Sequence, residues 1–315
     1  MMHFYTIFIV YDIKSMKGFI MRKVAILTDT NSGITPKEAE TLGIGLILMP
    51  IIIDGATYLE WKDLSYEEFF KIQDTDANIT TSQPSMQSMI DHFDTLLKDY
   101  ESVVFIPMSS GLSGTCQTAT MLANDYDGKV QVVNNLRISV TMRQSVLDAL
   151  HLAEHGFSAL EIKNILEREK FNSSIYITLQ TLKHLKKGGR ITPAAAAIGT
   201  LLKIKPVLQI QGDKLDSYAK ARGMSKAQSI MIDAMQKDID GRFAKFAAEN
   251  KVHMKASYTL TADDPERKAW EDHVKSTFGN FDFTAEPLPM SISTHIGYGA
   301  YAVACSCYIP ELEGE

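Results

Sequence analysis

The order of apolar and polar segments in the first half of the chain most strongly constrains its fold. Short apolar runs at 23–27, 103–107 and 130–133 predict strands, and each is followed by a polar turn and a helical pattern. This alternation indicates a parallel sheet covered by helices. In such sheets the turns after the strands lie at the edge where ligands bind. We therefore expect the functional residues of this half in its polar turns.

The second half of the chain has a different pattern, which predicts an α+β domain with a mixed sheet. The expected elements are a strand at 174–178, a helix at 179–187, a hairpin at 207–218 turning at 212–213, a helix at 224–246, a strand at 255–261, a helix at 264–278 and a strand at 283–288. With 315 residues, two domains are expected. We assign residues 21–169 and 170–315 to them. Residues 1–20 are treated as an N-terminal extension because Met21 is a natural second start.

Composition excludes several classes of protein. The net charge of −6 provides no basic surplus for nucleic acid. Cys116, Cys305 and Cys307 are odd in number and lack a CxxC spacing, so we expect no zinc site, no disulfide framework and a reducing, cytoplasmic location. No apolar run approaches the roughly 18 residues that a membrane span needs.

The segment SSGLSGT, residues 109–115, follows an expected strand and precedes an expected helix. It lacks the lysine of a Walker phosphate loop, and it is one residue short of the GxSxG nucleophile elbow. Its hydroxyls beside a helix N-terminus suit a small anion. The alternative is that Ser113 only caps the helix as its N-cap residue.

Four further segments carry polar residues beside turns: TSQPS at 81–85, LKKGGRI at 185–191, AKARG at 219–223 and HIGYGA at 295–300. We expect TSQPS to be a polar turn that enters a helix at Met86, and HIGYGA to begin a helix. In the two basic segments, LKKGGRI and AKARG, we expect the charged side chains to be exposed to solvent. His295 is the best candidate for an anion partner or an acid–base group, because it adjoins a G-x-G turn. No carboxylate is positioned by the sequence to orient it.

Together with TDTNSGI at 28–34, these segments resemble the DegV family in both content and order, from Met21 to the C-terminus. The resemblance implies two α/β domains with a long-chain fatty acid, such as palmitate, stearate or oleate, bound in the cleft between them. It implies no other cofactor. The protein would not itself be an enzyme but the binding subunit of a bacterial fatty acid kinase, which presents the acyl carboxylate to a separate ATP-dependent kinase subunit.

The resemblance also implies roles for individual residues. The carboxylate would be bound by Thr81, Ser82, Ser113, Gly114 and His295, while Arg190 and Arg222 would lie at the mouth of the cleft or contact the kinase. The small apolar segment 194–202 is expected either to line the acyl tunnel or to form interdomain core. Tyr298 stands where the family usually has proline, so we expect a less rigid loop there.

Two questions remain open at this point. A serine hydrolase acting on lipid esters, with Ser113 as nucleophile and His295 as base, is the alternative function. A transient contact with a membrane surface is left open as well.

Overall fold

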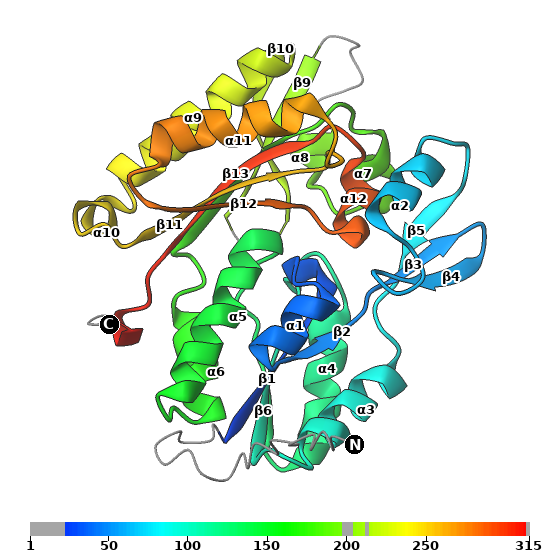
Figure 1. Cartoon of the computed structure of the whole chain (residues 1–315), viewed down its shortest axis with the longest axis vertical. Helices are drawn as coiled ribbons and strands as arrows, with labels where there is room; N and C mark the ends of the chain where they lie inside the picture. The colour runs from blue at the N-terminus through cyan, green and yellow to red at the C-terminus, as the bar shows by residue number, and fades with distance from the viewer. Residues whose placement is uncertain (1–22, 197–203, 212–213, 313–315) are drawn as a thin grey trace, which may run out of the picture.

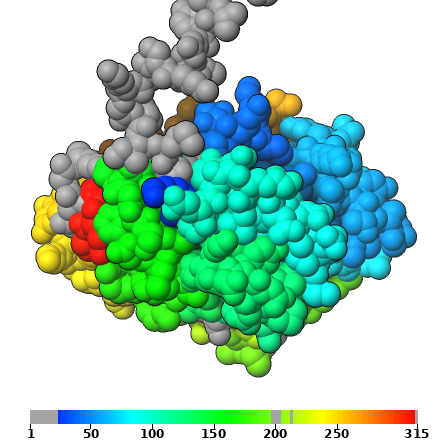
Figure 2. Space-filling view, turned by 90° about the horizontal axis from the view of Figure 1, so that it is seen from below, coloured from blue at the N-terminus to red at the C-terminus, as the bar shows by residue number. Residues whose placement is uncertain are grey.

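The computed structural model describes residues 23–196, 204–211 and 214–312 (Figure 1). The expected extension at 1–20, most of the segment 194–202 and the hairpin turn at 212–213 lie outside the described residues. The N-terminal domain lies at the bottom of the view in Figure 1 and the C-terminal domain at the top. Figure 2 shows the molecule from below, where the N-terminal domain (blue to green) forms most of the visible face.

The N-terminal domain is built on a parallel sheet, as the sequence predicted. Its strand order is β2-β1-β6-β7, with β1 at Val24–Asp29, β2 at Gly45–Ile47, β6 at Ser102–Ile106 and β7 at Val130–Val132. The helices are α1 (Pro36–Leu42), α3 (Met86–Leu96), α4 (Thr115–Ala123), α5 (Ser139–Glu154) and α6 (Ala159–Arg168). The chain continues from β1 to one side of the sheet and from β6 to the other, so the carboxyl ends of these adjacent strands form a ligand-binding crevice typical of this architecture.

The two faces of the sheet explain why the central strands are mainly apolar. Val24 and Ile26 pack in the core beneath α5 and α6, whereas Ala25 and Leu27 pack in the core beneath α3 and α4. Successive side chains of a strand point to opposite faces, so a sheet covered on both sides needs apolar residues at every position.

The start of α4 differs from the prediction. Gly114, not Ser113, is the N-cap residue, and it provides no side-chain cap. The hydroxyl oxygen of Ser113 instead accepts a hydrogen bond from the backbone N–H of Thr115 at 3.2 Å. It also lies 2.9 Å from Oγ1 of Thr115. Ser113 therefore forms its hydrogen bonds within the turn before α4, and it precedes the N-cap position by one residue.

A small antiparallel sheet was not predicted. It has the order β4-β3-β5, with β3 at Pro50–Ile53, β4 at Ala56–Leu59 and β5 at Ile79–Thr81. It packs with α2 (Tyr66–Gln73). The expectation that Thr81 lies in a turn was wrong, because it pairs with β3 as the last residue of β5. The helix after it begins at Met86 as predicted, capped by Ser85.

The C-terminal domain contains the predicted mixed sheet. Its order is β10-β9-β8-β13-β11-β12, with β8 at Ser173–Thr178, β9 at Ile204–Ile210, β10 at Asp216–Arg222, β11 at Val252–Tyr258, β12 at Asp282–Pro287 and β13 at Tyr301–Cys307. Only β11 and β12 pair in parallel. The helices α9 (Met224–Asp240), α10 (Ala244–Ala248) and α11 (Pro265–Phe278) lie along one side of this sheet (Figure 1).

The shorter helices of this domain, α7 (Lys183–Gly188), α8 (Pro193–Ala196) and α12 (Met290–Ile296), correct two predictions. The helix expected from 179 begins only at Lys183. The expectation that HIGYGA starts a helix was wrong: the segment ends one, because α12 includes its first two residues and stops at Ile296, where Gly297 follows with a φ of +77°. The helix expected at 224–246 is also divided, since α9 ends before Gly241.

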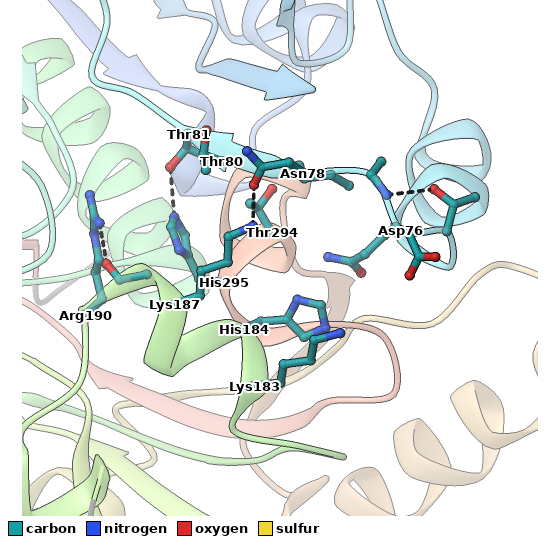
Figure 3. A pocket seen from close by; sticks show the side chains of 15 residues that line it. Asp76, Asn78, Thr80, Thr81, Lys183, His184, Lys187, Arg190, Thr294 and His295 are labelled. Atoms are coloured by element: carbon teal, nitrogen blue, oxygen red, sulfur yellow. Dashed lines mark hydrogen bonds between the residues drawn. The ribbon is translucent and has the colours of Figure 1, made fainter. Parts of the chain in front are cut away.

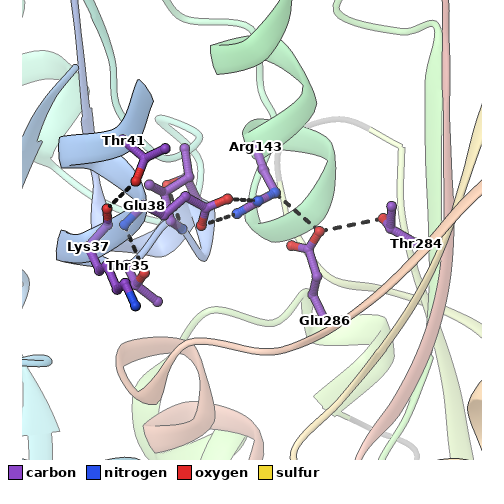
Figure 4. Close-up of polar contacts among 9 residues, drawn as sticks. Thr35, Lys37, Glu38, Thr41, Arg143, Thr284 and Glu286 are labelled. Carbon is purple, nitrogen blue, oxygen red and sulfur yellow. Dashed lines mark hydrogen bonds and ion pairs between the residues drawn. The ribbon is translucent and has the colours of Figure 1, made fainter. Parts of the chain in front are cut away.

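Apolar and ionic contacts join the two domains. Leu112, Ile138 and Val140 of the N-terminal domain share one core cluster with Ile177 and Ala302 of the C-terminal sheet. At the side of this cluster Arg143 on α5 pairs with Glu38 on α1 and, at 3.1 Å, with Glu286 on β12 (Figure 4). The site described next lies where these domains meet the small sheet.

Candidate ligand-binding site

A small pocket lies between the two domains and the small sheet; we call it the inner pocket. Its volume is ≈ 60 Å³. Five of the predicted site residues line it: Thr81, Ser82, Ser113, Arg190 and His295. They come from β5 and the turn after it, the loop before α4, the turn after α7, and α12. The fold thus brings together side chains that are far apart in the sequence.

The best-defined polar contact of the pocket joins Thr81 and His295. Oγ1 of Thr81 lies 2.8 Å from Nε2 of His295, across 214 residues of sequence (Figure 3). Burial, the Arg190 guanidinium and His184 lower the pKa of His295 from 6.5 to about 4. The imidazole is therefore neutral at neutral pH. In the tautomer protonated at Nε2 it donates to Thr81, which leaves the Thr81 hydroxyl proton free for a ligand.

Glycines allow α7 and α12 to approach closely. A Cβ atom at Gly188 would overlap Nδ1 of His295. A Cβ atom at Gly297 would lie 2.8 Å from Cδ2 of His184, again too close. Gly188 thus leaves room for the ring of His295, and Gly297 leaves room for the ring of His184.

The residues of the SSGLSGT turn lie at the same end of the pocket. Ser113 is partly buried and lines the pocket, whereas Gly114 is exposed and lies against the side-chain amide of Gln83. The hydroxyls of Thr81, Ser82 and Ser113 are therefore among the hydrogen-bonding groups that a ligand in the pocket can reach, together with the amide of Gln83 and the guanidinium of Arg190.

The geometry does not form a hydrolase triad. His295 pairs with Thr81, while Ser113 pairs with Thr115. Within the described residues no carboxylate hydrogen-bonds to His295. A serine nucleophile needs a base within hydrogen-bonding reach and a group that orients this base, and neither contact is formed here.

The remainder of the inner pocket is mainly apolar. Its apolar lining consists of Met49, Met108, Leu112, Ile138, Leu185, Leu215, Ile292 and Ile296. Met108, Leu112 and Ile138 come from the N-terminal domain, and Met49 precedes β3 of the small sheet. The other four residues belong to the C-terminal domain. Such a lining suits a hydrocarbon rather than a polar ligand.

Three polar residues that were not among the predicted site residues, Asn31, Gln83 and Ser291, also line the pocket. The Ser291 hydroxyl donates to Oδ1 of Asn31 at 3.0 Å, and Nδ2 of Asn31 donates to Asp29 at 2.7 Å. The backbone N–H of Ser291 donates to Glu60 at 3.2 Å, and the Thr30 hydroxyl donates to the same carboxyl at 2.6 Å. This buried network connects the end of β1 to the start of α12.

The carboxyl groups in this network are strongly affected by burial. Burial raises the pKa of Asp29 to about 6 and that of Glu60 to about 7. TDTNSGI was quoted as part of the family pattern, but nothing in the sequence around Glu60 or Ser291 indicated that they would meet.

The two arginines expected at the mouth lie in different places. Arg190 lines the inner pocket, and its guanidinium donates to the backbone oxygens of Leu112, at 3.3 Å, and Gly188. Arg222 is exposed at the end of β10 and is not among the described residues that line this pocket.

A second pocket, the outer pocket, shares Thr81, Arg190 and His295 with the inner one (Figure 3). It has a volume of ≈ 280 Å³ and opens between the segment before β5 and α7. Lys183, His184 and Lys187 of α7 line it. The sequence reasoning had treated the lysines before the glycine turn as solvated charges.

Tyr298, which stands where proline was expected, has specific partners. Its hydroxyl donates to Asp264 at 2.5 Å, and its ring meets that of Phe70 edge to face with centroids 5.0 Å apart. These side-chain contacts attach the loop after α12 to α2 and to the start of α11.

Comparisons with known proteins agree with the fold and with the motif order. A family model described as "Uncharacterised protein, DegV family" matches residues 23–307. The chain belongs to the DegV family. A DegV domain-containing protein of Listeria innocua is 30% identical over 290 residues, covering 90% of this chain and 98% of that protein.

Solved structures of DegV proteins have the same fold. One, described as fatty acid binding of a DegV family protein from Thermus thermophilus, matches with a TM-score of 0.81 and 27% identity, covering 91% of this chain and 100% of that chain. Another, of DegV, a fatty acid binding protein from Bacillus subtilis, matches with a TM-score of 0.78 and 25% identity over the same shares.

Two further properties concern the described residues alone. No helix among them is both long and apolar enough to cross a membrane. No group of three or more His, Cys, Asp or Glu side chains among them is arranged to hold a metal ion.

Proposed function

We propose that this DegV protein binds a long-chain fatty acid between its two domains and presents the carboxylate to a separate ATP-dependent kinase subunit. The observation that carries the proposal is the convergence of Thr81, Ser113 and His295 on one pocket whose remaining lining is mainly apolar. The description of the Thermus thermophilus and Bacillus subtilis relatives as fatty acid binding supports the same ligand.

The groups proposed to bind the carboxylate are hydroxyls and a neutral imidazole, which suits a carboxylate that has to react. Arg190 also lines the pocket, but its guanidinium donates to backbone oxygens. Hydroxyl groups bind the carboxylate by hydrogen bonds, and the neutral imidazole of His295 orients Thr81 without forming a salt bridge. In the kinase reaction a carboxylate oxygen would attack the γ-phosphorus of ATP and form a new P–O bond. The bond from that phosphorus to the β–γ bridging oxygen would break, and ADP would leave with the electron pair. No proton moves in this step.

The acyl chain would supply most of the affinity. Burial of each methylene contributes about 0.8 kcal/mol, so some fifteen methylenes contribute roughly 12 kcal/mol before ordering costs. Pockets for ligands of this size usually enclose about 300–1,000 Å³, whereas the inner pocket has ≈ 60 Å³. Binding of a long chain therefore requires the segments around the pocket to move apart.

The proposal includes a cytoplasmic location, where ATP is available and free cysteines such as Cys116, Cys305 and Cys307 persist. It also includes a transient contact with a membrane surface, from which a hydrophobic acyl chain can be collected.

The ligand is tested by extracting the purified protein and analysing the extract by mass spectrometry, and by titrating delipidated protein with oleate. We expect a fatty acid in the extract and saturable binding of oleate. A protein that carries no lipid and ignores oleate would contradict the proposal.

The kinase step is tested separately, with a bacterial fatty acid kinase subunit, ATP and the oleate-loaded protein. We expect acyl phosphate to form, and the double variant Thr81→Ala/Ser113→Ala to form much less of it while unfolding at a similar temperature. Oleate binding without acyl phosphate formation would retain the lipid ligand and reject the kinase partner.

A further inference from the structure

The outer pocket is basic, although the protein as a whole is acidic. Lys183, Lys187 and Arg190 line it, together with one carboxylate, that of Asp76 (Figure 3). Within the described part of the chain none of these three cationic side chains forms an ion pair with a carboxylate. The net charge of the chain is −6, so this local excess of positive charge does not follow from composition.

Nearby histidines respond to this positive charge. Burial and the charges of Lys183 and Lys187 lower the pKa of His184. Arg190 and His184 in turn contribute to the low pKa of His295. The positive potential therefore extends from the mouth of the outer pocket to the Thr81–His295 pair, where it would attract an anion.

The two pockets meet at this pair, which lines both of them. The apolar inner pocket suits the hydrocarbon of an acyl ligand, and its head group at Thr81 and His295 faces the basic outer pocket. A group that is attached to the carboxylate would therefore lie in the outer pocket. The carboxylate itself is bound by neutral groups, so the lysines are left for a second, more highly charged group.

We propose that the outer pocket binds the phosphoryl group of the acyl phosphate, with Lys183 and Lys187 as its cationic partners. This inference rests on the function proposed above and assigns a product site that the carboxylate-binding residues do not include. Lysine ammonium groups bind phosphate oxygens through charge and hydrogen bonds, and they act as point charges on flexible side chains. Both lysines are exposed on α7, and Lys187 is directed toward this pocket by a 2.5 Å contact with Oδ1 of Asn78.

A terminal phosphoryl group could reach this pocket from two sources, the acyl phosphate or the ATP that donates it. The test compares three probes on the delipidated full chain: palmitate, the methylene-bridged phosphonate analogue of palmitoyl phosphate, and a non-hydrolysable ATP analogue. Binding of each is measured by calorimetry for the wild type and for the double variant Lys183→Gln/Lys187→Gln. The matched control is Lys186→Gln, an exposed lysine of the same helix that does not line the pocket.

We expect the double variant to bind the phosphonate analogue at least about tenfold more weakly, which corresponds to about 1.4 kcal/mol. Its affinity for palmitate should change by less than about twofold, and Lys186→Gln should leave both affinities unchanged. Raising the salt concentration should weaken binding of the phosphonate more than binding of palmitate.

An unchanged affinity for the phosphonate in the double variant, or an equal loss for palmitate, would overturn the inference. Binding of the ATP analogue to the wild type that depends on both lysines would assign the pocket to the phosphate donor and would likewise overturn the product site. A wild-type protein that binds no palmitate would reject the proposed function instead, so the two failures are distinguishable.

Discussion

The imidazole of His295 lies against Gly188, and no side chain larger than hydrogen fits at position 188 without displacing it. This contact joins the end of α7 to α12 and keeps Nε2 of His295 at 2.8 Å from Thr81. The relationship explains why a glycine is needed inside the basic segment that precedes Arg190.

Substitution Gly188→Ala should therefore weaken fatty acid binding. We expect the ring of His295 to move and its hydrogen bond to Thr81 to be lost, which reduces palmitate affinity by about 2- to 10-fold, equivalent to roughly 0.5–1.5 kcal/mol. Thermal unfolding serves as the control, because alanine is the better helix former and should not by itself destabilise α7. Unchanged affinity would show that the contact does not position His295.

The pKa of His295 should depend on Arg190. Burial, Arg190 and His184 hold this pKa at about 4, below its usual 6.5, so Arg190→Gln should raise it. The measurement is an NMR titration of the imidazole protons, with Arg222→Gln as a control of equal charge change outside the pocket. Bound fatty acid should also raise the pKa, because a carboxylate stabilises the imidazolium form. A pKa that does not respond to Arg190→Gln would assign the shift to burial and His184.

Protein stability should fall as the pH rises through the titration of Glu60. Burial raises the pKa of Glu60 from 4.5 to about 7, so between these pH values the folded state holds a proton that the unfolded chain has lost. The free energy of unfolding should decrease over this range by up to about 3 kcal/mol. Urea unfolding of Glu60→Gln should show a smaller slope with pH; the exposed Glu101→Gln should retain the wild-type slope, and an unaltered slope in Glu60→Gln would contradict the prediction.

The ion pairs of Arg143 should stabilise the contact between the domains. The side chains of Arg143, Glu38 and Glu286 are 14%, 30% and 20% exposed, so Arg143→Ala leaves two poorly solvated carboxylates without a cation. We expect a loss of about 1.5–3 kcal/mol in the free energy of unfolding. The control Lys268→Ala removes a pair whose lysine is 79% exposed and should cost at most about 1 kcal/mol. Equal losses for both variants would refute this assignment.

Ser113 should not react as a nucleophile. Its hydroxyl pairs with Thr115 and not with His295, so no base is in place to take its proton. A fluorophosphonate probe, followed by mass spectrometry of the tryptic peptides, should give no adduct at Ser113 under conditions that label a bacterial lipase completely. Stoichiometric labelling of Ser113 would restore the hydrolase alternative.

The two central strands of the parallel sheet, β1 and β6, were predictable because each contains a continuous apolar run, which a sheet covered on both faces requires. The helix at Pro36 was predictable from Thr35, proline at the first position and an acidic first turn. In contrast, β5 has only three residues and is partly polar, and its pairing with β3 crosses more than twenty positions. The helix α12 begins without a side-chain cap, so its start had no local signal.

The sequence by itself determined the alternation of strands and helices, the polar turns and the types of side chain available for binding. These follow from periodicity and turn chemistry, which are local. Only the tertiary structure decided that His295 meets Thr81 rather than Ser113, and that the exposed Lys183 and Lys187 line a pocket. Such pairings depend on how α7, α12 and β5 pack across large separations in sequence. The helices α7 and α12 can approach closely because Gly188 and Gly297 leave room for the rings of His295 and His184. No local sequence pattern indicates this contact.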